Sequence, residues 1–287
     1  MSVPGSSERK LAGVAAGLEA DEIVIDLEDA VAASAKEDAR KATVAALSAW
    51  GGGVVSVRVN AARSPWCHLD VAALAGLGDV PVSIVVPKVE DGGDLAFFDR
   101  LLDGAEAAGG RRRPLRLQAL IETAAGLERV SEIAGASRRL DALILGYADL
   151  AASLGRAPGG AGDLETWRWA QEAVLVAARA HGLQAIDGPY LGVEVDEGFR
   201  AAAGRARDLG FDGKWAIHPA QVAALNELFT PTLREVDRAR AIVAALDRAE
   251  RETGQGAVAL NGEMLDEAVR AAALRILARA HPPGAAR

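Results

Sequence analysis

Short β-favouring runs alternate with longer Ala-rich stretches of helical character along most of this chain, and this pattern constrains the fold more than any other feature. Seven such runs are visible, and they begin at Glu22, Val54, Val82, Leu115, Leu140, Gly182 and Gly213. Helical stretches lie between them, for example at residues 35–49, 94–108, 167–181 and 196–209, and several end in Gly, as a helix C-cap does. Strand followed by helix, repeated, predicts a parallel sheet covered by helices.

A stub at residues 2–5 is a candidate eighth strand, and eight strands would close a barrel. The competing architecture is a doubly wound open sheet, but no G-x-G-x-x-G follows the first long strand to mark a dinucleotide site. We therefore predict an α/β protein with a (β/α)₈ TIM barrel over residues 1–229. Residues 230–287 change pattern and predict a C-terminal helical extension, with helices at 233–253 and 263–280 joined by a loop or hairpin.

Charge and cysteine content exclude several classes of function. A formal net charge of −8 and an isoelectric point near 5.2 argue against a nucleic-acid or membrane-surface binder, because such a protein needs a basic surface. The single cysteine, Cys67, cannot form an intrachain disulfide. We expect a cytoplasmic protein without a membrane or nucleic-acid partner.

Polar residues end the β-runs, where a barrel places its catalytic groups. They are Asp26, Glu28, Asp29, Arg58, Asn60, Lys88, Glu122, Asp149, Asp187 and His218. Strand alternation puts Val24, Asp26 and Glu28 on one face, with the carboxylates in the barrel mouth. Carboxylates that converge need a cation, and Mg²⁺ prefers such oxygen ligands.

Each of these candidates has an alternative interpretation. Asp29 by itself is equally well explained as a cap of the next helix, and Arg58 either holds a substrate carboxylate or is a structural ion-pair partner. Lys88 is a candidate Schiff-base lysine, but the carboxylates favour a metal-dependent route.

Eight short motifs occur in the order and spacing of a known family. They are "VPGSSER", "VIDLEDAV", "VRVN", "VVPKVE", "ALIETAAGL", "ILGYADLAASLG", "AIDGPY" and "GFDGKWAIHPAQV". Together they resemble the HpcH/HpaI aldolase and citrate lyase β-subunit-like family over nearly the whole chain. The resemblance implies a Mg²⁺-dependent barrel that cleaves or forms a carbon–carbon bond in β-hydroxyacyl thioesters, as malyl-, citramalyl- and citryl-CoA lyases do.

The resemblance also implies roles for individual residues. Glu122 and Asp149 would be the metal ligands, with Glu122 also near the substrate, and Arg58 would bind the keto-acid carboxylate. Asp266, in "NGEMLDEAV", would be the catalytic acid and base, reaching the active site of a neighbouring subunit. Asp26, Glu28 and Asp29 would hold metal-bound waters. Arg9 and Lys36 would contact the CoA phosphates.

Three functions follow from this reading. The first is a stand-alone acyl-CoA lyase with a 2-keto acid as the other product, acting as a homo-oligomer, a trimer or hexamer. The second is a citrate lyase β subunit that works on an acyl-carrier-protein thioester. The third is a related thioesterase, or a barrel that only binds keto acids.

Overall fold

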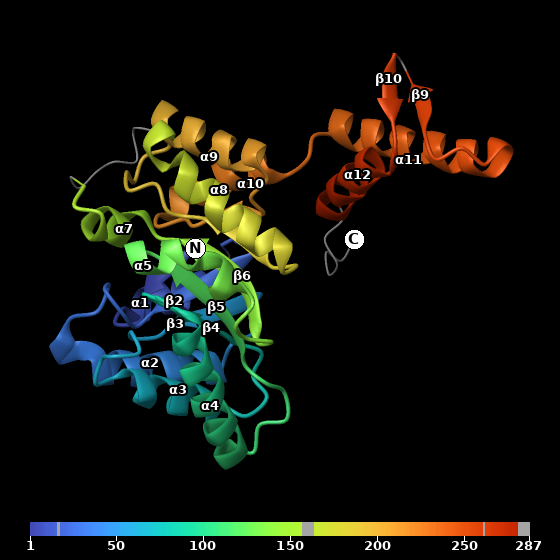
Figure 1. Ribbon diagram of the computed structural model, residues 1–287. Coiled ribbons are helices and arrows are strands. Elements are labelled where there is room, and N and C mark those ends of the chain that lie inside the picture. The colour runs from blue at the N-terminus through green and yellow to red at the C-terminus, as the bar shows by residue number, and fades with distance from the viewer. Residues whose placement is uncertain (16–17, 157–163, 261, 281–287) are drawn as a thin grey trace. The chain divides into compact units, whose positions relative to one another are not determined.

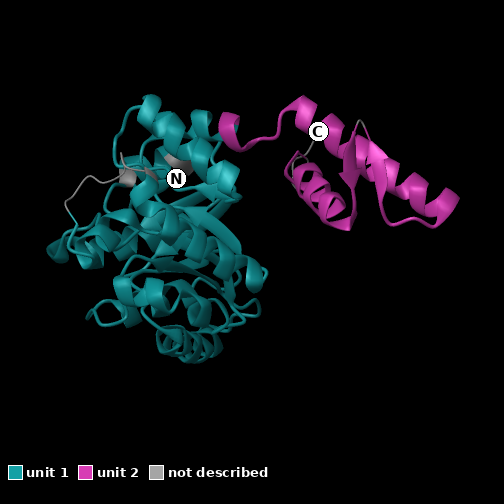
Figure 2. Cartoon of the chain, turned by 45° about the horizontal axis from the view of Figure 1, so that its top comes forward, with its two compact units in different colours: residues 1–226 teal, residues 227–287 magenta. Residues whose placement is uncertain are grey.

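A computed structural model of the protein describes residues 1–15, 18–156, 164–260 and 262–280. The chain divides into two compact units, Met1–Asn226 and Glu227–Arg287, shown in teal and magenta in Figure 2. Each unit has its own core and is described by itself. Among the described residues, none of the helices has the length and apolar character needed to cross a bilayer.

The first unit is built on an eight-stranded sheet whose strands pair in parallel and in chain order (Figure 1). The strands are β1 (Ser2–Pro4), β2 (Glu22–Asp26), β3 (Val54–Arg58), β4 (Ser83–Val86), β5 (Arg116–Ile121), β6 (Leu140–Leu145), β7 (Gln184–Asp187) and β8 (Gly213–Lys214). A doubly wound sheet would reverse its strand order at a switch point, so this order excludes it. The predicted eight-stranded parallel sheet is confirmed, including the stub strand, which pairs Ser2 with Val24.

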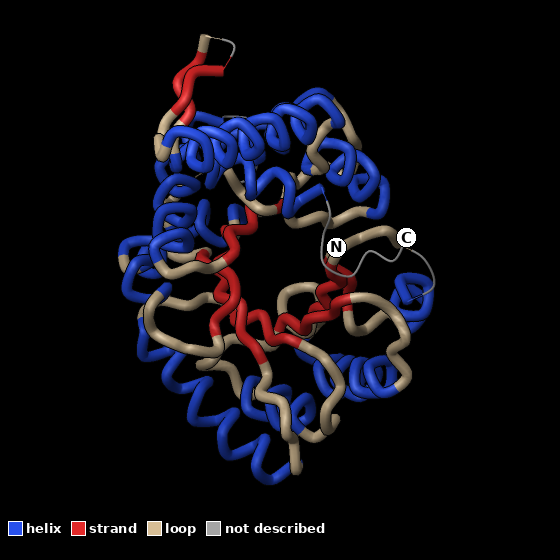
Figure 3. The backbone as a smooth tube through the Cα atoms, turned by 90° about the vertical axis from the view of Figure 1, so that its right-hand side faces the viewer, coloured by secondary structure: helices blue, strands red, loops and turns tan. Residues whose placement is uncertain are grey.

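The sheet curls around its own interior, with helices outside, as Figure 3 shows. Its two edge strands are β1 and β8, and the segment just after β8 contacts β1, where the Ser2 amide donates to the Ala216 carbonyl oxygen at 2.9 Å. No strand ladder between β1 and β8 is present in the described part of the chain. The structure therefore shows a curled parallel sheet, and among the described residues one backbone hydrogen bond links β1 to the segment after β8.

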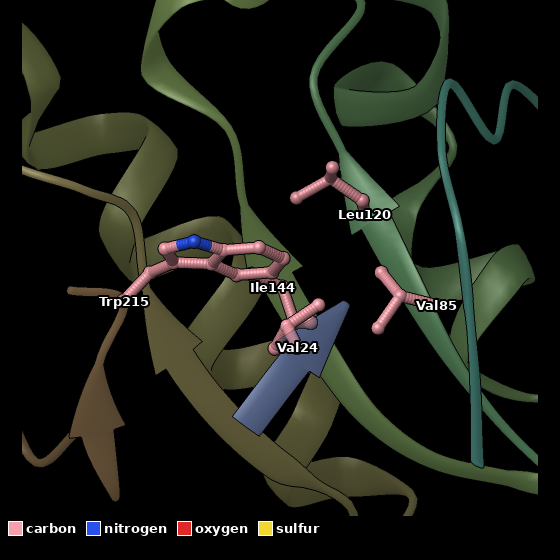
Figure 4. Close-up of a cluster of buried hydrophobic side chains, with 5 residues drawn as sticks. All are labelled: Val24, Val85, Leu120, Ile144 and Trp215. Atoms are coloured by element: carbon pink, nitrogen blue, oxygen red, sulfur yellow. The ribbon is translucent and has the colours of Figure 1, made fainter. Parts of the chain in front are cut away.

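Apolar side chains from many strands fill the inside of the sheet. Figure 4 shows the cluster of Val24, Val85, Leu120, Ile144 and Trp215, which point toward one another. Burying such side chains contributes roughly 1.5–3 kcal/mol each. The alternation predicted for the second strand holds, since Val24 lies in this cluster while Ile23 and Ile25 are buried on the other face.

Helices cover the outside of the sheet and connect its strands. They are α1 (Glu8–Ala15), α2 (Lys36–Ser48) after the short 3₁₀ turn η1 (Ala33–Ala35), α3 (Cys67–Ala75), α4 (Gly92–Gly109), α5 (Ala124–Glu128), α6 (Val130–Ala134), α7 (Tyr147–Ser153), α8 (Leu164–Ala180), α9 (Glu197–Leu209) and α10 (Pro219–Phe229). Caps set the ends of several: the Asp91 side chain accepts from the Asp94 amide at the start of α4, and left-handed Gly110 ends it.

The second unit is a helical hairpin with a small β-hairpin between its helices. It consists of α11 (Leu233–Thr253), β9 (Val258–Leu260), β10 (Glu263–Leu265) and α12 (Glu267–Ala280). The helix predicted from residue 263 begins later, because Met264 pairs with Ala259 in the β-hairpin and the Asp266 side chain caps α12. Ile242, Leu246 and Leu265 form its core, with Ala239 and Ala273.

Candidate active site

A cavity of about 780 Å³ lies at the carboxyl ends of the strands in the first unit. Seven of the residues singled out from the sequence line it: Arg9, Asp26, Asp29, Arg58, Glu122, Asp149 and His218. Apolar side chains such as Leu120 and Trp215 form its floor, where they belong to the interior cluster. The topology brings these residues together because parallel strands present their carboxyl ends at one edge.

Asp26 and Arg58 form the best-defined pair in this cavity. They are direct neighbours in the register of β2 and β3, so their side chains lie on the same face. Arg58 donates from Nε to Asp26 Oδ1 at 2.9 Å and from Nη2 to Oδ2 at 2.5 Å. Asp26 also accepts the backbone amides of Glu28 and Ala30, which fixes the chain after β2. Arg58 is thus an ion-pair partner and a cavity residue at once.

The Arg58 guanidinium stays charged. Burial lowers the pKa of Arg58, but the hydrogen bonds and charge of Asp26, together with Glu28 and Glu122, outweigh that effect and raise it. Its Nη1 atom also lies 3.2 Å from Glu28 Oε2. A permanent, oriented cation in a cavity can bind a substrate carboxylate.

Lys88 neutralises the carboxylates next to that pair. Its Nζ atom donates to Glu28 Oε1 at 2.6 Å and to Asp29 Oδ2 at 3.2 Å. Asp29 is therefore an ion-pair residue. It does not cap the following helices, because neither η1 nor α2 has a side-chain hydrogen bond at its N-cap. Burial lowers the pKa of Lys88, but Glu28, Glu122 and Asp149 raise it overall. A Schiff base requires a neutral amine, so this environment argues against that alternative.

Glu122 follows β5 and is the most perturbed carboxylate of the site. It is 2% exposed, and its Oε1 accepts the backbone amide of Lys88 at 2.9 Å. Burial, followed by the charges of Glu28 and Asp149, raises the pKa of Glu122 to about 8. The positive charges of Arg58 and Lys88 lower this pKa, but burial and the neighbouring carboxylates outweigh them.

Asp149 lies in the first turn of α7, directly after β6, and is half-buried on the cavity wall. The loop between them approaches Glu122 closely: a Cβ atom on Gly146 would lie 2.6 Å from Glu122 Cβ and 2.7 Å from its Oε2. A glycine is therefore needed where β6 ends. In the sequence, this glycine is the second residue of "LGYAD", three positions before Asp149.

The donor set fits a hard divalent cation. Glu122 and Asp149 offer carboxylate oxygens in one cavity, and Mg²⁺ would neutralise the charge of buried Glu122. In the described ranges no cluster of three or more His, Cys, Asp or Glu side chains is arranged to hold a metal. A metal here would take one or two protein carboxylates and leave its other positions to water or substrate, as Mg²⁺ commonly does.

Glu28 and Lys36, two residues with predicted roles in the site, do not line this cavity. Glu28 is buried behind it, between Arg58 and Lys88. Lys36 is also buried, and its Nζ atom donates to the carbonyl oxygens of Leu27 and Glu28 at 2.8 and 2.7 Å, so its ammonium anchors the end of β2 and does not line the cavity. Asp266 belongs to the second unit, where it is exposed and its Oδ1 accepts the Val269 amide.

A buried polar network behind Tyr147 was not predicted as a unit. Lys214 donates to Asp187 Oδ2 at 2.5 Å, with 2% and 0% of the two side chains exposed. Tyr147 lines the cavity and donates its hydroxyl to Asp187, and Gln171 donates to the Tyr147 oxygen at 2.8 Å. The sequence predicts Asp187 as a strand-end residue, and Lys214 at the end of the next strand is the residue that could have indicated the ion pair.

Comparisons with known proteins identify related sequences and structures. The family described as HpcH/HpaI aldolase/citrate lyase matches residues 1–219. An L-malyl-CoA/β-methylmalyl-CoA lyase of Cereibacter sphaeroides is 41% identical over 92% of this chain and 88% of its own length. A (3S)-malyl-CoA thioesterase of the same species is 38% identical over 97% and 92%. A crystal structure of CitE from Mycobacterium tuberculosis, in complex with magnesium, acetoacetate and coenzyme A, is 29% identical with a TM-score of 0.77, covering 97% of this chain and 96% of that one.

Proposed function

Because the chain belongs to the HpcH/HpaI aldolase/citrate lyase family, we propose that it is a Mg²⁺-dependent lyase of β-hydroxyacyl-CoA thioesters such as malyl-CoA, β-methylmalyl-CoA or citramalyl-CoA. The enzyme would break, or form in reverse, one carbon–carbon bond, with an acyl-CoA and a 2-keto acid as the two fragments. The observation that carries the proposal is buried Glu122, which faces the same cavity as Asp149 and Arg58 and has a pKa raised to about 8.

Glu122 and Asp149 are the residues that would hold Mg²⁺. When bound, the ion would polarise the keto-acid oxygens and stabilise negative charge that develops on them. The Lys88 amide fixes one oxygen of Glu122, which leaves the other for the metal. Asp26 holds the Arg58 guanidinium through two of its N–H groups, so the rest of this cation can bind the keto-acid carboxylate.

The acyl fragment needs a group that moves a proton at its α-carbon. In the condensation direction that group removes the proton, and in cleavage it returns the proton to the thioester enolate. We assign this role to Asp266 and propose that it serves the cavity of a neighbouring subunit within a homo-oligomer, a trimer or hexamer. Support comes from its exposure at the start of α12 and from its place in the tail.

Subunit sharing has a direct test. Asp266→Asn protein and Glu122→Ala protein would each be inactive, and mixed oligomers should regain part of the activity because some sites would contain both intact residues. Subunit exchange is confirmed by native mass spectrometry, which also gives the oligomeric state. Exchange without recovered activity would contradict the assignment.

Three further points belong to the proposal. Residues 1–229 would form a closed (β/α)₈ barrel, supported by the Ser2–Ala216 hydrogen bond, with residues 230–287 as its helical extension. Arg9, exposed on α1 and lining the cavity, would contact the CoA phosphates. The enzyme would work in the cytoplasm.

The decisive experiment is a panel of β-hydroxyacyl-CoA esters incubated with protein and Mg²⁺, with the released keto acid trapped and measured. We expect release from at least one malyl- or citramalyl-type ester, and loss of release with EDTA and with Glu122→Ala. Asp38→Asn, which changes an exposed carboxylate on α2, is the matched control and should keep full activity. Activity that survives EDTA or Glu122→Ala would refute the metal assignment.

A second candidate function is thioester hydrolysis, which the similarity to a (3S)-malyl-CoA thioesterase favours. The same assay separates the two reactions by their products. A lyase yields a keto acid and acyl-CoA, whereas a thioesterase yields the hydroxy acid and free CoA thiol. Citrate lyase β-type activity would show as turnover of an acyl-carrier-protein thioester in place of the CoA ester.

A further inference from the structure

Lys88 has a backbone conformation that is unusual for its residue type. Its φ of 53° makes it the sole non-glycine residue with positive φ in the described part of the chain. Left-handed backbone is unfavourable for a lysine and tends to persist at functional sites. Close packing holds the segment in place, since a Cβ atom on Gly126 would lie only 2.1 Å from the Val89 carbonyl oxygen.

This conformation lets Lys88 contact three carboxylates at once. Its backbone amide donates to Glu122 Oε1 at 2.9 Å, while its ammonium binds Glu28 at 2.6 Å and Asp29 at 3.2 Å. Glu28 in turn uses its other oxygen toward Arg58 at 3.2 Å. Lys88 thus joins the candidate metal ligand to the carboxylates beside it.

Lys88 is one of three cations whose charges act directly on the carboxylates of the site. We call the five carboxylates the acidic cluster: Asp26, Glu28, Asp29, Glu122 and Asp149. Arg58, Lys88 and Lys36 are the cations whose charges act on this cluster. Arg9 and Lys10 also line the cavity, on α1. Removing Lys88 would take one positive charge away from the acidic cluster, next to a cavity that has to admit an anion.

We propose that Lys88 is a positioning residue that sets this charge balance, so that an anionic 2-keto acid can bind beside the metal. The inference rests on the proposed function, because it takes the keto acid as the ligand. Lys88 forms ion pairs with Glu28 and Asp29. It thereby offsets one negative charge without binding the substrate itself. Its loss therefore affects the two ligands in opposite directions.

The predicted signs follow from Coulomb's law. A more negative cavity attracts Mg²⁺ more strongly and repels a keto acid. Because the Lys88 side chain is one-third exposed, solvent screens the effect, and we expect a change of about tenfold in keto-acid affinity. If Lys88 had only a structural role, its loss would weaken the binding of Mg²⁺ and of the keto acid together.

The test is isothermal titration calorimetry on the full-length Lys88→Met protein. Mg²⁺ alone is titrated first, and then pyruvate, glyoxylate and oxaloacetate at saturating Mg²⁺. We expect keto-acid binding to weaken about tenfold while Mg²⁺ binding stays the same or tightens. Lys88→Arg should restore keto-acid affinity, and pyruvamide, a neutral analogue of pyruvate, should bind the wild type and Lys88→Met equally.

Two further variants make the result interpretable. Lys88→Gly removes the ammonium and relieves the left-handed backbone, so it replaces Lys88→Met if that protein does not fold. Lys41→Met is the matched control, because Lys41 pairs with Glu37 at 2.7 Å on exposed α2, and it should change neither affinity.

The inference and the proposed function fail in different ways. A wild type that binds none of the keto acids in the presence of Mg²⁺ refutes the proposed function and the inference with it. A wild type that binds them, with the Lys88 variants unchanged, refutes only the inference. Joint weakening of Mg²⁺ and keto acid in Lys88→Gly also refutes it, because it reveals a structural role.

Discussion

Lowering the pH below about 8 is expected to weaken Mg²⁺ binding, because Glu122 must lose a proton before it can bind the ion. Burial and the charges of Glu28 and Asp149 raise the pKa of this carboxyl to about 8 in the metal-free protein. Below that pH the affinity for Mg²⁺ falls about tenfold per pH unit, since one proton competes with the metal. Binding should therefore strengthen as the pH rises and level off above about 8.

The same perturbation links pH to folding. The pKa of Glu122 in the folded protein lies above the usual value of 4.5. The contribution of the protonated carboxyl to the stability of the metal-free protein is therefore fully present below pH 4.5 and is lost as the pH rises to about 8. The full difference corresponds to about 5 kcal/mol in the free energy of unfolding. Saturating Mg²⁺ should restore stability at high pH by binding the folded state.

Calorimetric titration of Mg²⁺ between pH 6 and 9, in buffers with different ionisation enthalpies, measures both affinity and proton release. About one proton should leave per bound ion near pH 6 and close to none at pH 9. Glu122→Gln should abolish this release and flatten the pH dependence of metal-free stability. An affinity that is flat from pH 6 to 8, with no proton release, would refute the reasoning.

Two further predictions concern residues that support the site. Lys214→Met should lower the free energy of unfolding by about 3–5 kcal/mol, because it leaves fully buried Asp187 without its cation, and urea denaturation measures this. Adding Asp187→Asn should recover part of the loss. Gly146→Ala should weaken Mg²⁺ binding at least about tenfold, because its Cβ atom would displace Glu122. Gly104→Ala, in open space on α4, should leave Mg²⁺ binding unchanged, and a clear loss there would undermine the comparison.

The periodic features of the sequence were enough to predict the sheet. Alternating β-runs and helices predicted eight parallel strands in chain order, and the period of two placed Val24 in the interior. Strand ends also predicted the cavity, because the topology collects Asp26, Arg58, Glu122 and Asp149 at one edge. Such patterns are local and repeat, so a single sequence can show them.

Features that depend on tertiary contacts were not predictable in this way. A basic residue near a motif can face a ligand or the protein, and Lys36 turns inward to two backbone carbonyls. Nothing in the sequence marks Lys88 as left-handed, and the close approach of Gly126 to the Val89 carbonyl oxygen beside it is a tertiary contact. The start of the helix predicted from residue 263 is the strand β10 in the structure, because these residues pair with β9 on the other side of a turn.

The single hydrogen bond between Ser2 and Ala216 also has a consequence for how ligands reach the site. An edge that one bond secures opens at lower free energy than a strand with a full ladder, so amide exchange should be fastest there. Ser2, Val3 and Pro4 form part of the cavity wall. Brief separation of this seam would move this wall of the cavity that receives the thioester, while Glu122 and Asp149, which follow β5 and β6, keep their places.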